Sequence, residues 1–517
     1  MRIAVSNIKM PILHTKEQVL KTARDIVRSA CVCAKDFEIY KQSIDARHKN
    51  NICYVYTVTA ETDKKITPAG NISIIDEDTD LIIPKKLLKT RPVVVGSGPC
   101  GLFAAYILAL SGNPPLVLER GADIEERALA VESFRKTGIL DKNTNIQFGE
   151  GGAGTFSDGK LTCRIGDSRQ RFILKTFVEN GAPEDILYKA KPHIGTDKLQ
   201  TTIKAMREKL IEMGTEFRFK SLVCDIEIKN ERVLGVCVND FEHISCDNLI
   251  LAIGHSSRDT YYMLEKNGLK IEPKPFAIGV RIEHCQSFID FLQYKGVSGL
   301  PPADYRLAYN GEKRSCYSFC MCPGGYVVNA SSEDEALSIN GMSRYKRDGE
   351  NANSALVVTV SPNDFGKGTL AGIEFQRKYE RLAFSLGGGD MSAPVQLAED
   401  FLKDIPSVDI KSVNPSVTTG FRLAELKNCL PVYVTQTLKD GLCDFNRRMN
   451  GFASNGAVLT GIEARTSAPV RLVRNESLQS EFVHGLYPAG EGAGYAGGIV
   501  SAALDGIRCA YALIEND

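Results

Sequence analysis

The chain has 517 residues, 43% of them hydrophobic, which is enough for about two to four domains with buried cores. Its 63 basic and 63 acidic side chains give a formal net charge of zero, so no overall field attracts nucleic acid or an anionic membrane, and small-molecule chemistry is favoured. The 15 cysteines, together with a beginning (Met1-Arg2-Ile3-Ala4-Val5) that lacks the features of a secretory signal, indicate a reducing cytoplasm.

The first part of the chain, residues 1–88, has the pattern of a small α+β domain. Its predicted elements are a strand, an amphipathic helix and two alternating strands, over Ile3–Met10, Lys16–Ala30, Phe37–Ile44 and Asn51–Thr59. This order resembles one half of a ferredoxin-like fold. The acidic stretch Asp76–Asp80 is interpreted as a linker to the next domain.

A glycine-rich turn follows a short apolar strand that starts at Pro92. The turn, Gly96-Ser97-Gly98-Pro99-Cys100-Gly101, has G-x-G-x-x-G spacing and continues into a predicted helix, Leu102–Leu110. The first glycine permits the tight turn, the second lets a pyrophosphate approach the backbone, and the third lets helix and strand pack closely. The helix start then offers unpaired N–H groups and a partial positive charge to the phosphates. The uncharged stretch Val93–Leu110 is therefore interpreted as strand, turn and helix rather than as a membrane span.

The next predicted strand, Pro115–Arg120, carries an acid near its end. Glu119 lies about 20 residues beyond the turn, where this motif places the carboxylate that accepts hydrogen bonds from a ribose. We expect Glu119 and Arg120 to contact the nucleotide part of a cofactor. A plain glycine turn without a ligand is the less favoured interpretation.

The C-terminal region, from Gly451, returns to strand, glycine-rich turn and helix. Its turn contains Gly490-Glu491 and Gly497-Gly498-Ile499 and leads into a helix from Val500. This arrangement resembles the last FAD motif of the glutathione-reductase-like flavoprotein superfamily, in which an acid contacts the ribityl chain or ribose and the helix start faces the flavin. The resemblance implies cofactor contacts from Gly490, Gly497, Gly498 and Ile499, and from Glu491 in place of the more usual aspartate.

A middle motif completes the resemblance. Phe217–Gly254 has the pattern of a β-meander that ends in a strand, Asn248–Ile253, followed by Gly254. In the superfamily the meander contacts adenine through a valine, which implies this role for Val223. His255 is interpreted as a cap of the next helix. Three motifs in the superfamily's order predict FAD as the cofactor rather than NAD.

A fourth feature is the glycine-rich segment Gln147–Leu161, whose backbone can fold closely over a cofactor. We expect cofactor contacts from Gly152, Gly154, Thr155 and Lys160, and the alternative is an ordinary surface loop. Together with Lys274–Arg281, Phe319–Gly325 and Gly461–Ser467, this segment resembles the bacterial family of uncharacterised FAD-dependent proteins labelled "NAD(FAD)-utilising dehydrogenases". The resemblance covers nearly the whole chain and implies a fold and a cofactor, but no substrate.

The motifs predict an α/β fold with three structural parts. A discontinuous Rossmann-type FAD-binding domain comprises residues 89–267 and 451–517, and a substrate or cap domain of α+β type, residues 268–450, is inserted between its pieces. The insertion contains a helical stretch near Asp364–Ser385. No second glycine fingerprint follows a strand, so either the substrate reduces the flavin directly or NAD(P)H binds on the cap.

Candidate catalytic residues are those that could orient a substrate or supply a proton. They are Lys160, Arg281, Arg314, Cys320, Cys322 and Arg465. Arg281 and Arg465 suit a carboxylate or phosphate, with a structural ion pair as the equally weighted alternative. The cluster of Cys316, Cys320 and Cys322 lacks the usual spacing of a redox pair beside a flavin and a fourth ligand for zinc. We interpret it as core or loop cysteines and expect no metal.

Two functions are compatible with these motifs. The favoured one is a cytoplasmic FAD-dependent oxidoreductase, a dehydrogenase or reductase that transfers hydride between a small organic substrate and non-covalently bound FAD. The alternative is an FAD-containing protein that binds or modifies RNA through the N-terminal domain, whose basic residues are Lys9, Lys16, Lys21, Arg24, Arg28, Lys35, Lys41, Arg47 and Lys49. Acidic residues interleave with these cations and no clear aromatic stacking pair lies on the predicted strands, so nucleic acid is the less favoured partner.

Overall fold

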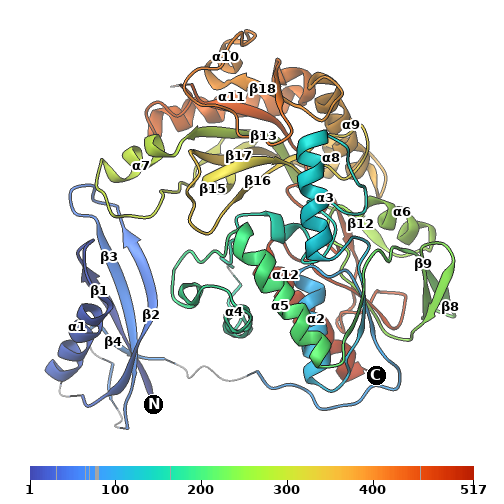
Figure 1. Ribbon diagram of the computed structural model, residues 1–517, viewed down its shortest axis with the longest axis horizontal. Helices are drawn as coiled ribbons and strands as arrows, with labels where there is room; N and C mark the ends of the chain where they lie inside the picture. The colour runs from blue at the N-terminus through green and yellow to red at the C-terminus, as the bar shows by residue number, and fades with distance from the viewer. Residues whose placement is uncertain are drawn as a thin grey trace.

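The N-terminal domain is a four-stranded antiparallel sheet with one helix, and it stands apart from the rest of the chain in Figure 1. The computed structural model describes residues 1–30, 32–63, 66–68, 70–75, 81–163, 165–454 and 456–516, and the predicted linker Asp76–Asp80 lies outside them. The elements are β1 (Arg2–Met10), α1 (Lys16–Ser29), β2 (Lys35–Asp45), β3 (Cys53–Glu61) and β4 (Ile72–Ile74), in sheet order β2-β3-β1-β4. The predicted strand, helix, strand, strand order is confirmed, and β4 is a further strand that pairs with β1.

The second part is built on a parallel sheet of five strands. They are β5 (Val93–Val95), β6 (Leu116–Leu118), β7 (Glu216–Arg218), β11 (Leu249–Leu251) and β22 (Leu486–Pro488), in the order β22-β11-β5-β6-β7. The chain adds β6 on one side of β5 and later β11 on the other side. This reversal opens a crevice at the carboxyl ends of the strands, where open α/β sheets bind their ligands. The glycine turn after β5 lies at that point, so the Rossmann-type arrangement is confirmed.

Alternate residues of the sheet face two different layers. Val94, Val117 and Ile250 pack on the helices α2 (Pro99–Leu110), α4 (Arg169–Glu179), α5 (Thr196–Glu212) and α12 (Ile499–Asn516). The other face packs on α6 (Arg258–Lys266) and on the predicted meander, β8 (Val223–Lys229), β9 (Arg232–Val238) and β10 (Glu242–Ser245). We did not predict α4 and α5, which lie between β6 and β7.

Glycines allow α2 to lie close to its neighbours. A Cβ on Gly101 would overlap the Gly96 carbonyl oxygen, and a Cβ on Gly506 would overlap the Cys100 carbonyl oxygen. The first contact is the close strand–helix packing expected of the fingerprint, and the second brings α12 against the first turn of α2. Gly96 itself has a φ of +98°, which a residue with a side chain rarely adopts.

The third part is a large mixed sheet with the order β14-β15-β17-β13-β20-β18-β19, in which β16 pairs with β15. Its strands are β13 (Phe276–Cys285), β14 (Ala308–Asn310), β15 (Ser315–Asn329), β16 (Ile339–Ser343), β17 (Asn351–Val360), β18 (Ala393–Leu397), β19 (Phe421–Leu423) and β20 (Val458–Glu463). Its helices are α7 (Gln286–Tyr294), α8 (Pro362–Phe365), α9 (Ala371–Leu386), α10 (Ala398–Lys403) and α11 (Val432–Arg448). The predicted helix near Asp364–Ser385 is therefore two helices, α8 and α9, separated by a short stretch that contains Gly366 and Gly368.

One predicted domain boundary is wrong. We placed the return to the FAD-binding part at Gly451, but β20 lies between β13 and β18 in the large sheet. The return comes only after β20, where β21 (Val470–Leu472) pairs with β12 (Ile271–Pro273). The error has a physical reason, because all six residues of β20 are buried, as they would be in a central strand of the parallel sheet.

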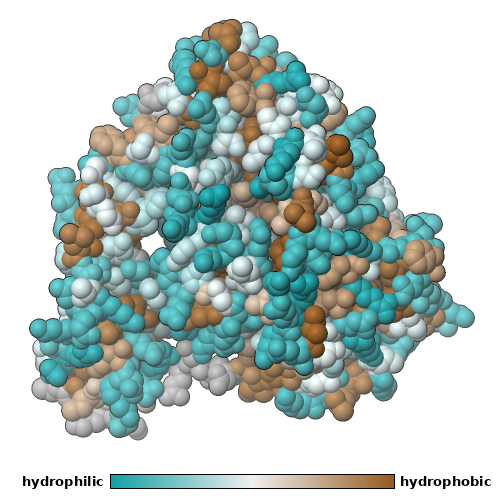
Figure 2. Space-filling view, in the orientation of Figure 1, coloured by the Kyte–Doolittle hydropathy of each residue, from teal (hydrophilic) through white to brown (hydrophobic). Residues whose placement is uncertain are grey.

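The surface in Figure 2 is mostly hydrophilic and is hollowed between the N-terminal domain and the other two parts. None of the helices in the described ranges is long and apolar enough to cross a bilayer.

Candidate functional site

A cavity of about 1790 Å³ lies where the three parts of the molecule meet. Its walls come from residues 42–54 of the N-terminal domain, from the glycine turns of the Rossmann-type part, and from β14 and β15 of the large sheet. Cavities for one small ligand measure about 300–1,000 Å³. This one therefore has room for a dinucleotide and a second ligand.

Two helix starts meet at this cavity. Gly96, Gly98 and Pro99 line it before α2, and the run Gly497-Gly498-Ile499 lines it at the start of α12. A Cβ on Gly98 would have only the Gly152 Cα nearby, at 3.7 Å, and a Cβ on Gly497 would have no atom within 4 Å. The glycines therefore leave open space in front of backbone N–H groups that carry a partial positive charge.

The predicted ribose acid, Glu119, also lines the cavity, but protein donors occupy both of its oxygens. Oε2 accepts from the Ser97 backbone N–H and hydroxyl, both at 2.9 Å. Oε1 accepts from the N–H groups of Gly121 at 2.9 Å and Gly149 at 3.0 Å. The carboxylate thus joins the fingerprint turn to the glycine-rich segment, and a ribose contact stays a prediction.

The glycine-rich segment is a shaped wall held by Arg127 of α3 (Ile124–Thr137), a residue that the sequence motifs did not indicate. This fully buried guanidinium donates hydrogen bonds to the backbone carbonyls of residues 145, 146, 149, 150 and 152, at 2.5–3.2 Å. Burial lowers the pKa of Arg127 to about 10, which leaves it charged at neutral pH. The alternative of an ordinary surface loop is therefore wrong, because the turn of this segment is tied to a buried cation, whereas the expected cofactor contacts stay a prediction.

The predicted cofactor residues divide into two groups. Those that line the cavity are Gly96, Gly98, Pro99, Cys100, Glu119, Arg120, Gly152, Gly154, Lys160, Val223, Gly254, Glu491, Gly497, Gly498 and Ile499. Ser97, Gly101, Thr155 and Gly490 lie behind this wall, where they shape the turns. Gly490, for example, has a φ of +73° and its N–H donates to Asp505 at 2.7 Å.

Arg120 has protein partners of its own. Its guanidinium forms two hydrogen bonds to the Asp259 carboxylate, at 2.7 and 3.0 Å, and stacks over the Phe148 ring at 4.1 Å. These contacts indicate that Arg120 fastens α6 to the cavity wall.

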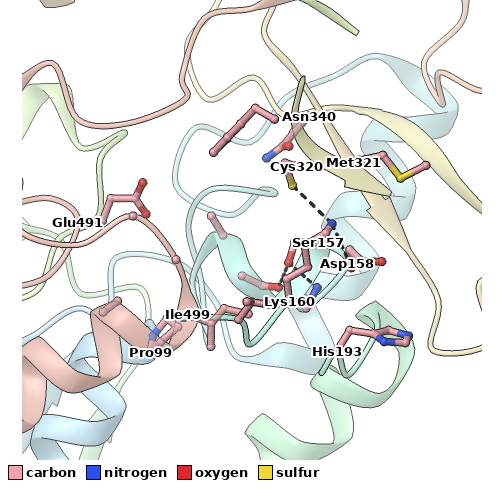
Figure 3. A pocket seen from close by; sticks show the side chains of 18 of the residues that line it. Pro99, Ser157, Asp158, Lys160, His193, Cys320, Met321, Asn340, Glu491 and Ile499 are labelled. Atoms are coloured by element: carbon pink, nitrogen blue, oxygen red, sulfur yellow. Dashed lines mark hydrogen bonds and ion pairs between the residues drawn. The ribbon is translucent and has the colours of Figure 1, made fainter. Parts of the chain in front are cut away.

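Glu491 is a carboxyl group whose acidity is changed by its surroundings. Burial raises its pKa to about 7, against an opposing effect of the Lys274 charge. Glu491 faces the cavity on the α12 side, across from Lys160 (Figure 3). At neutral pH the carboxyl is therefore divided between its acid and its anion.

Lys160 is the centre of a polar cluster on the cavity wall. Its ammonium lies 3.1 Å from Asp158 Oδ2 and 3.9 Å from Cys320 Sγ (Figure 3). It also lies 3.6 Å from Cys322 Sγ. Asp158 also binds Arg347 through two hydrogen bonds, at 2.6 and 3.1 Å. Burial alone would lower the pKa of Lys160, but the Asp158 charge and the two thiols raise it above its usual range. Lys160 is thus a permanent cation beside two sulfur atoms.

The prediction that Cys320 and Cys322 are core or loop cysteines is only partly right. Cys322 is buried, whereas Cys320 lines the cavity. Cys316, the third member of the predicted cluster, is buried in the core of the large sheet, where burial raises its pKa to about 12. The sequence alone did not distinguish the surroundings of these three cysteines, because all three lie on one strand.

Arg281 forms the buried ion pair that was the alternative to substrate binding. Its side chain is fully buried, and its Nε donates to Glu463 Oε2 at 2.7 Å. The remaining nitrogens donate to Asn353 and Asn340, at 2.7 and 2.9 Å, and at 3.4 Å to the Cys320 carbonyl. Its hydrogen bonds are thus directed inside the protein, which makes a direct grip on a substrate unfavourable.

Arg465 also forms a buried pair, although it lines the cavity. Its guanidinium binds the Glu380 carboxylate through two bonds of 2.9 and 2.8 Å, and Arg258 binds the same carboxylate from the other side at 2.7 and 2.9 Å. Burial, and then the charges of Arg465 and Arg258, lower the pKa of the neighbouring His255 to about 4. His255 therefore lines the cavity as a neutral imidazole at pH 7.

The other candidates lie away from the site or have partners. Arg314 forms a partly buried pair with Asp364 in the large-sheet domain. In the N-terminal domain, Arg47 pairs with Asp45, and Lys49 donates to the Gln293 carbonyl at 2.5 Å. Tyr54 and Tyr56 form an aromatic pair that we did not predict, with ring centroids 6.3 Å apart. Within the described residues, no three His, Cys, Asp or Glu side chains form a group that could hold a metal.

Comparison with known proteins places this chain in a family. An uncharacterized protein of Clostridium beijerinckii is 51% identical over 494 residues, which cover 93% of this chain and 92% of that protein. The chain belongs to the same family as that protein. Residues 275–466 match the family described as "FAD-dependent protein, C-terminal domain-like", and residues 2–61 match a domain of unknown function. The first match ends just after β20, in agreement with the corrected domain boundary.

Solved structures show only distant similarity. The glycine oxidase of Bacillus cereus is 12% identical, with a TM-score of 0.32 over 83% of this chain and 98% of that one. A geranylgeranyl bacteriochlorophyll reductase-like protein of Thermoplasma acidophilum is 15% identical, with a TM-score of 0.34 over 82% and 77% of the two chains. CtdE in complex with FAD is 12% identical, with a TM-score of 0.32 over 81% and 83%. The α/β fold of this family member is defined by its own parallel sheet rather than by these similarities.

Proposed function

We propose that this protein binds FAD non-covalently in the central cavity and acts as an oxidoreductase on a small organic substrate. The observation that carries the proposal is the meeting of two glycine-lined helix starts, those of α2 and α12, at one cavity. FAD has two parts that suit such positions, an anionic pyrophosphate and a ring that takes on negative charge when reduced. The family match of residues 275–466 supports the same cofactor.

The residues present fit this cofactor. Gly98 and the start of α2 would face the pyrophosphate, because a Cβ there would project into otherwise open space. Glu119 and Val223 are assigned to the adenosine side, and Glu491 with the start of α12 to the flavin side. The part of the cavity beside Lys160 and β15 would remain for the substrate.

Bound FAD would supply hydride chemistry, and side chains of the chain would orient the substrate and exchange a proton. Lys160 offers a positive charge and N–H donors to an anionic or carbonyl group. His255 is neutral at pH 7, so it can accept a proton without first losing one. Glu491, with a pKa of about 7, can either donate or accept one. The electron donor is then the substrate itself or NAD(P)H bound on the large-sheet domain.

The experiment that tests the cofactor assignment is Gly98→Ala. The backbone at Gly98 (φ −72°, ψ −179°) suits alanine, and the new Cβ would meet only the Gly152 Cα at ordinary contact distance. We expect the fold to persist, with Tm within about 2 °C, while the added methyl group weakens FAD binding by about tenfold or more. Fluorescence titration of the purified protein with FAD measures the Kd. Gly166→Ala is the control, because that glycine lies outside the cavity and a Cβ there would meet no atom within 4 Å.

The activity is tested separately. The bound flavin is photoreduced under anaerobic conditions, and a set of electron acceptors is then screened. We expect at least one acceptor to reoxidise the flavin faster than buffer alone does. NADH and NADPH are tested as electron donors under the same anaerobic conditions. A protein that purifies colourless and takes up no FAD would overturn the cofactor assignment. A yellow protein that no acceptor reoxidises would leave FAD binding but remove the oxidoreductase activity.

A further inference from the structure

Two thiols and an ammonium group meet on an irregular part of β15. The register of β15 against β17 shifts between Phe319 and Cys322, so the strand is bulged there. Cys320, inside the bulge, has a φ of +45°, a conformation that residues with side chains rarely adopt. Bulges commonly re-aim a side chain beside an active site. Here both sulfur atoms lie within 4 Å of the Lys160 ammonium, and Cys320 lines the cavity (Figure 3).

We propose that Cys320 and Cys322 form a thiol–disulfide exchange site for small anionic disulfides, with Cys320 as the attacking thiolate and Cys322 as the resolving thiol. Lys160 holds Cys320 in its charged form. This site goes beyond the proposed flavin chemistry and stands on the thiols alone.

The surroundings divide the two sulfur atoms into an anion and a neutral thiol. A hydrogen bond with Cys322, and then the charges of Lys160 and Arg281, lower the pKa of Cys320 well below its usual range despite burial and the Asp158 charge. The same hydrogen bond and burial raise the pKa of Cys322 well above its usual range. A thiolate is the attacking species in exchange, and the second thiol must stay protonated until the mixed disulfide has formed.

Other titratable groups around this pair complete its electrostatics. Glu463 interacts with Cys320 from β20, Tyr305 interacts with Cys322, and Arg347 binds Asp158 beside Lys160. Glu463 is engaged by Arg281, and Asp158 by Arg347. Asp158 is thus shared between Arg347 and Lys160, and Lys160 is the cation that contacts both this carboxylate and the two sulfur atoms.

The charge of the cavity wall indicates the class of disulfide. The lining residues of segments 42–54, 189–193 and 293–310 include five cations, Arg47, Lys49, Lys189, Lys191 and Arg306. Three of them form ion pairs, with Asp45, Asp185 and Asp304, so these eight side chains together carry a net charge of +2. An anionic molecule is therefore favoured on the path to Cys320. A small disulfide with carboxylates at its ends is both anionic and open to attack by a thiolate.

The exchange conserves atoms and electrons. The Cys320 thiolate attacks one sulfur of the substrate, the substrate S–S bond breaks, and one half leaves as a thiolate that takes a proton from water. Cys322 then loses its proton and attacks the Cys320 sulfur, which releases the second half and leaves a Cys320–Cys322 disulfide. The substrate gains two electrons and the protein dithiol loses two. Renewal of the dithiol by a reduced cofactor in the same cavity is a link that rests on the proposed function.

The test uses the full chain at pH 7, with oxidised glutathione as the anionic disulfide and cystamine as its cationic counterpart. After quenching with iodoacetamide, peptide mass spectrometry follows each cysteine. We expect a Cys320–Cys322 disulfide in the wild type, a stable glutathione adduct on Cys320 in Cys322→Ser, and no adduct on Cys322 in Cys320→Ser. Oxidised glutathione should react about tenfold faster than cystamine.

The role of Lys160 has its own measurement. In Lys160→Met, we expect Cys320 to react about tenfold more slowly than in the wild type at pH 7. Above about pH 9 its rate should approach the wild-type rate, because the thiolate then forms without the cation. Exposed Cys443 is the internal reference, and the buried Cys429 reports the fold by staying unmodified. Faster reaction at Cys443 than at Cys320 in the wild type, or an unchanged pH profile in Lys160→Met, would overturn the proposal. If Lys160→Met does not fold, the pH profile of the wild type decides.

The flavin absorbance of the same samples separates this proposal from the proposed function. A colourless protein whose Cys320 exchanges would contradict only FAD binding. A yellow protein whose Cys320 is inert would contradict only the thiol site.

Discussion

The Rossmann-type part and the large-sheet domain form walls of the same cavity by different means. The first uses backbone: Gly98 and Gly497 lack a Cβ and leave open space for a ligand in front of the main chain. The second uses charged side chains that are held in buried pairs, such as Arg281 with Glu463, whose positions are 182 residues apart in the chain. A wall of bare backbone requires glycine and is therefore visible in a sequence, whereas a pair of side chains is visible only once the strands are in place.

The difference also concerns stability. A buried pair is costly to break, because removing one partner leaves the other charge without compensation. A glycine in open space at the cavity can be changed with little effect on the fold, as we expect for Gly98. The two walls should therefore respond differently to single substitutions, and three predictions test this contrast.

The largest expected effect is that of Glu380→Gln. Glu380 is fully buried between Arg258 and Arg465, so the substitution leaves two buried guanidinium groups with a neutral partner. We expect the free energy of unfolding to fall by about 3–5 kcal/mol, measured in urea. Asp390→Asn is the control, because its pair with Arg422 is about half exposed and should be worth less than about 1 kcal/mol. Equal losses in the two variants would remove the contrast between buried and exposed pairs.

A smaller effect tests whether the backbone wall depends on side chains after all. Arg127→Met removes the donors to five carbonyls of the glycine-rich segment and should cost about 2–4 kcal/mol. Hydrogen exchange of residues 145–152 should rise together with this loss. Arg127→Lys, which retains a charge and three donors, should recover part of the protection. Unchanged exchange in Arg127→Met would mean that Glu119 alone holds the segment.

The smallest effect is a pH dependence of stability. The pKa of Glu491 is raised from 4.5 to about 7 in the folded protein. Its favourable contribution is present in full below pH 4.5 and is lost as the pH rises through 7, because the buried anion is disfavoured. Glu491→Gln should therefore match the wild type near pH 4 and exceed its stability by about 1–3 kcal/mol at pH 8–9. Thermal unfolding across this range measures the difference, and parallel curves for the two proteins would contradict it.

Much of the fold could be predicted from local patterns, and the errors have identifiable causes. The fingerprint turn, the meander and the helix after Gly498 agree with their sequence patterns because each depends on neighbouring residues. The boundary at Gly451 failed because β20 is a buried strand that fits two different sheets. Arg127 went unnoticed because no spacing rule marks a cation that binds carbonyls some 20 residues further along the chain.

The sequence by itself determined the α/β class, the glycine turns and the choice of cofactor to test, because a turn without a Cβ is encoded at single positions. Only the tertiary structure decided that Arg281 and Arg465 are paired inside the protein, that Glu119 joins two loops, and that Lys160 lies beside Cys320 and Cys322. These facts depend on strands and loops that meet across long stretches of chain, and the energy of a charge depends on the partner and burial that it finds there.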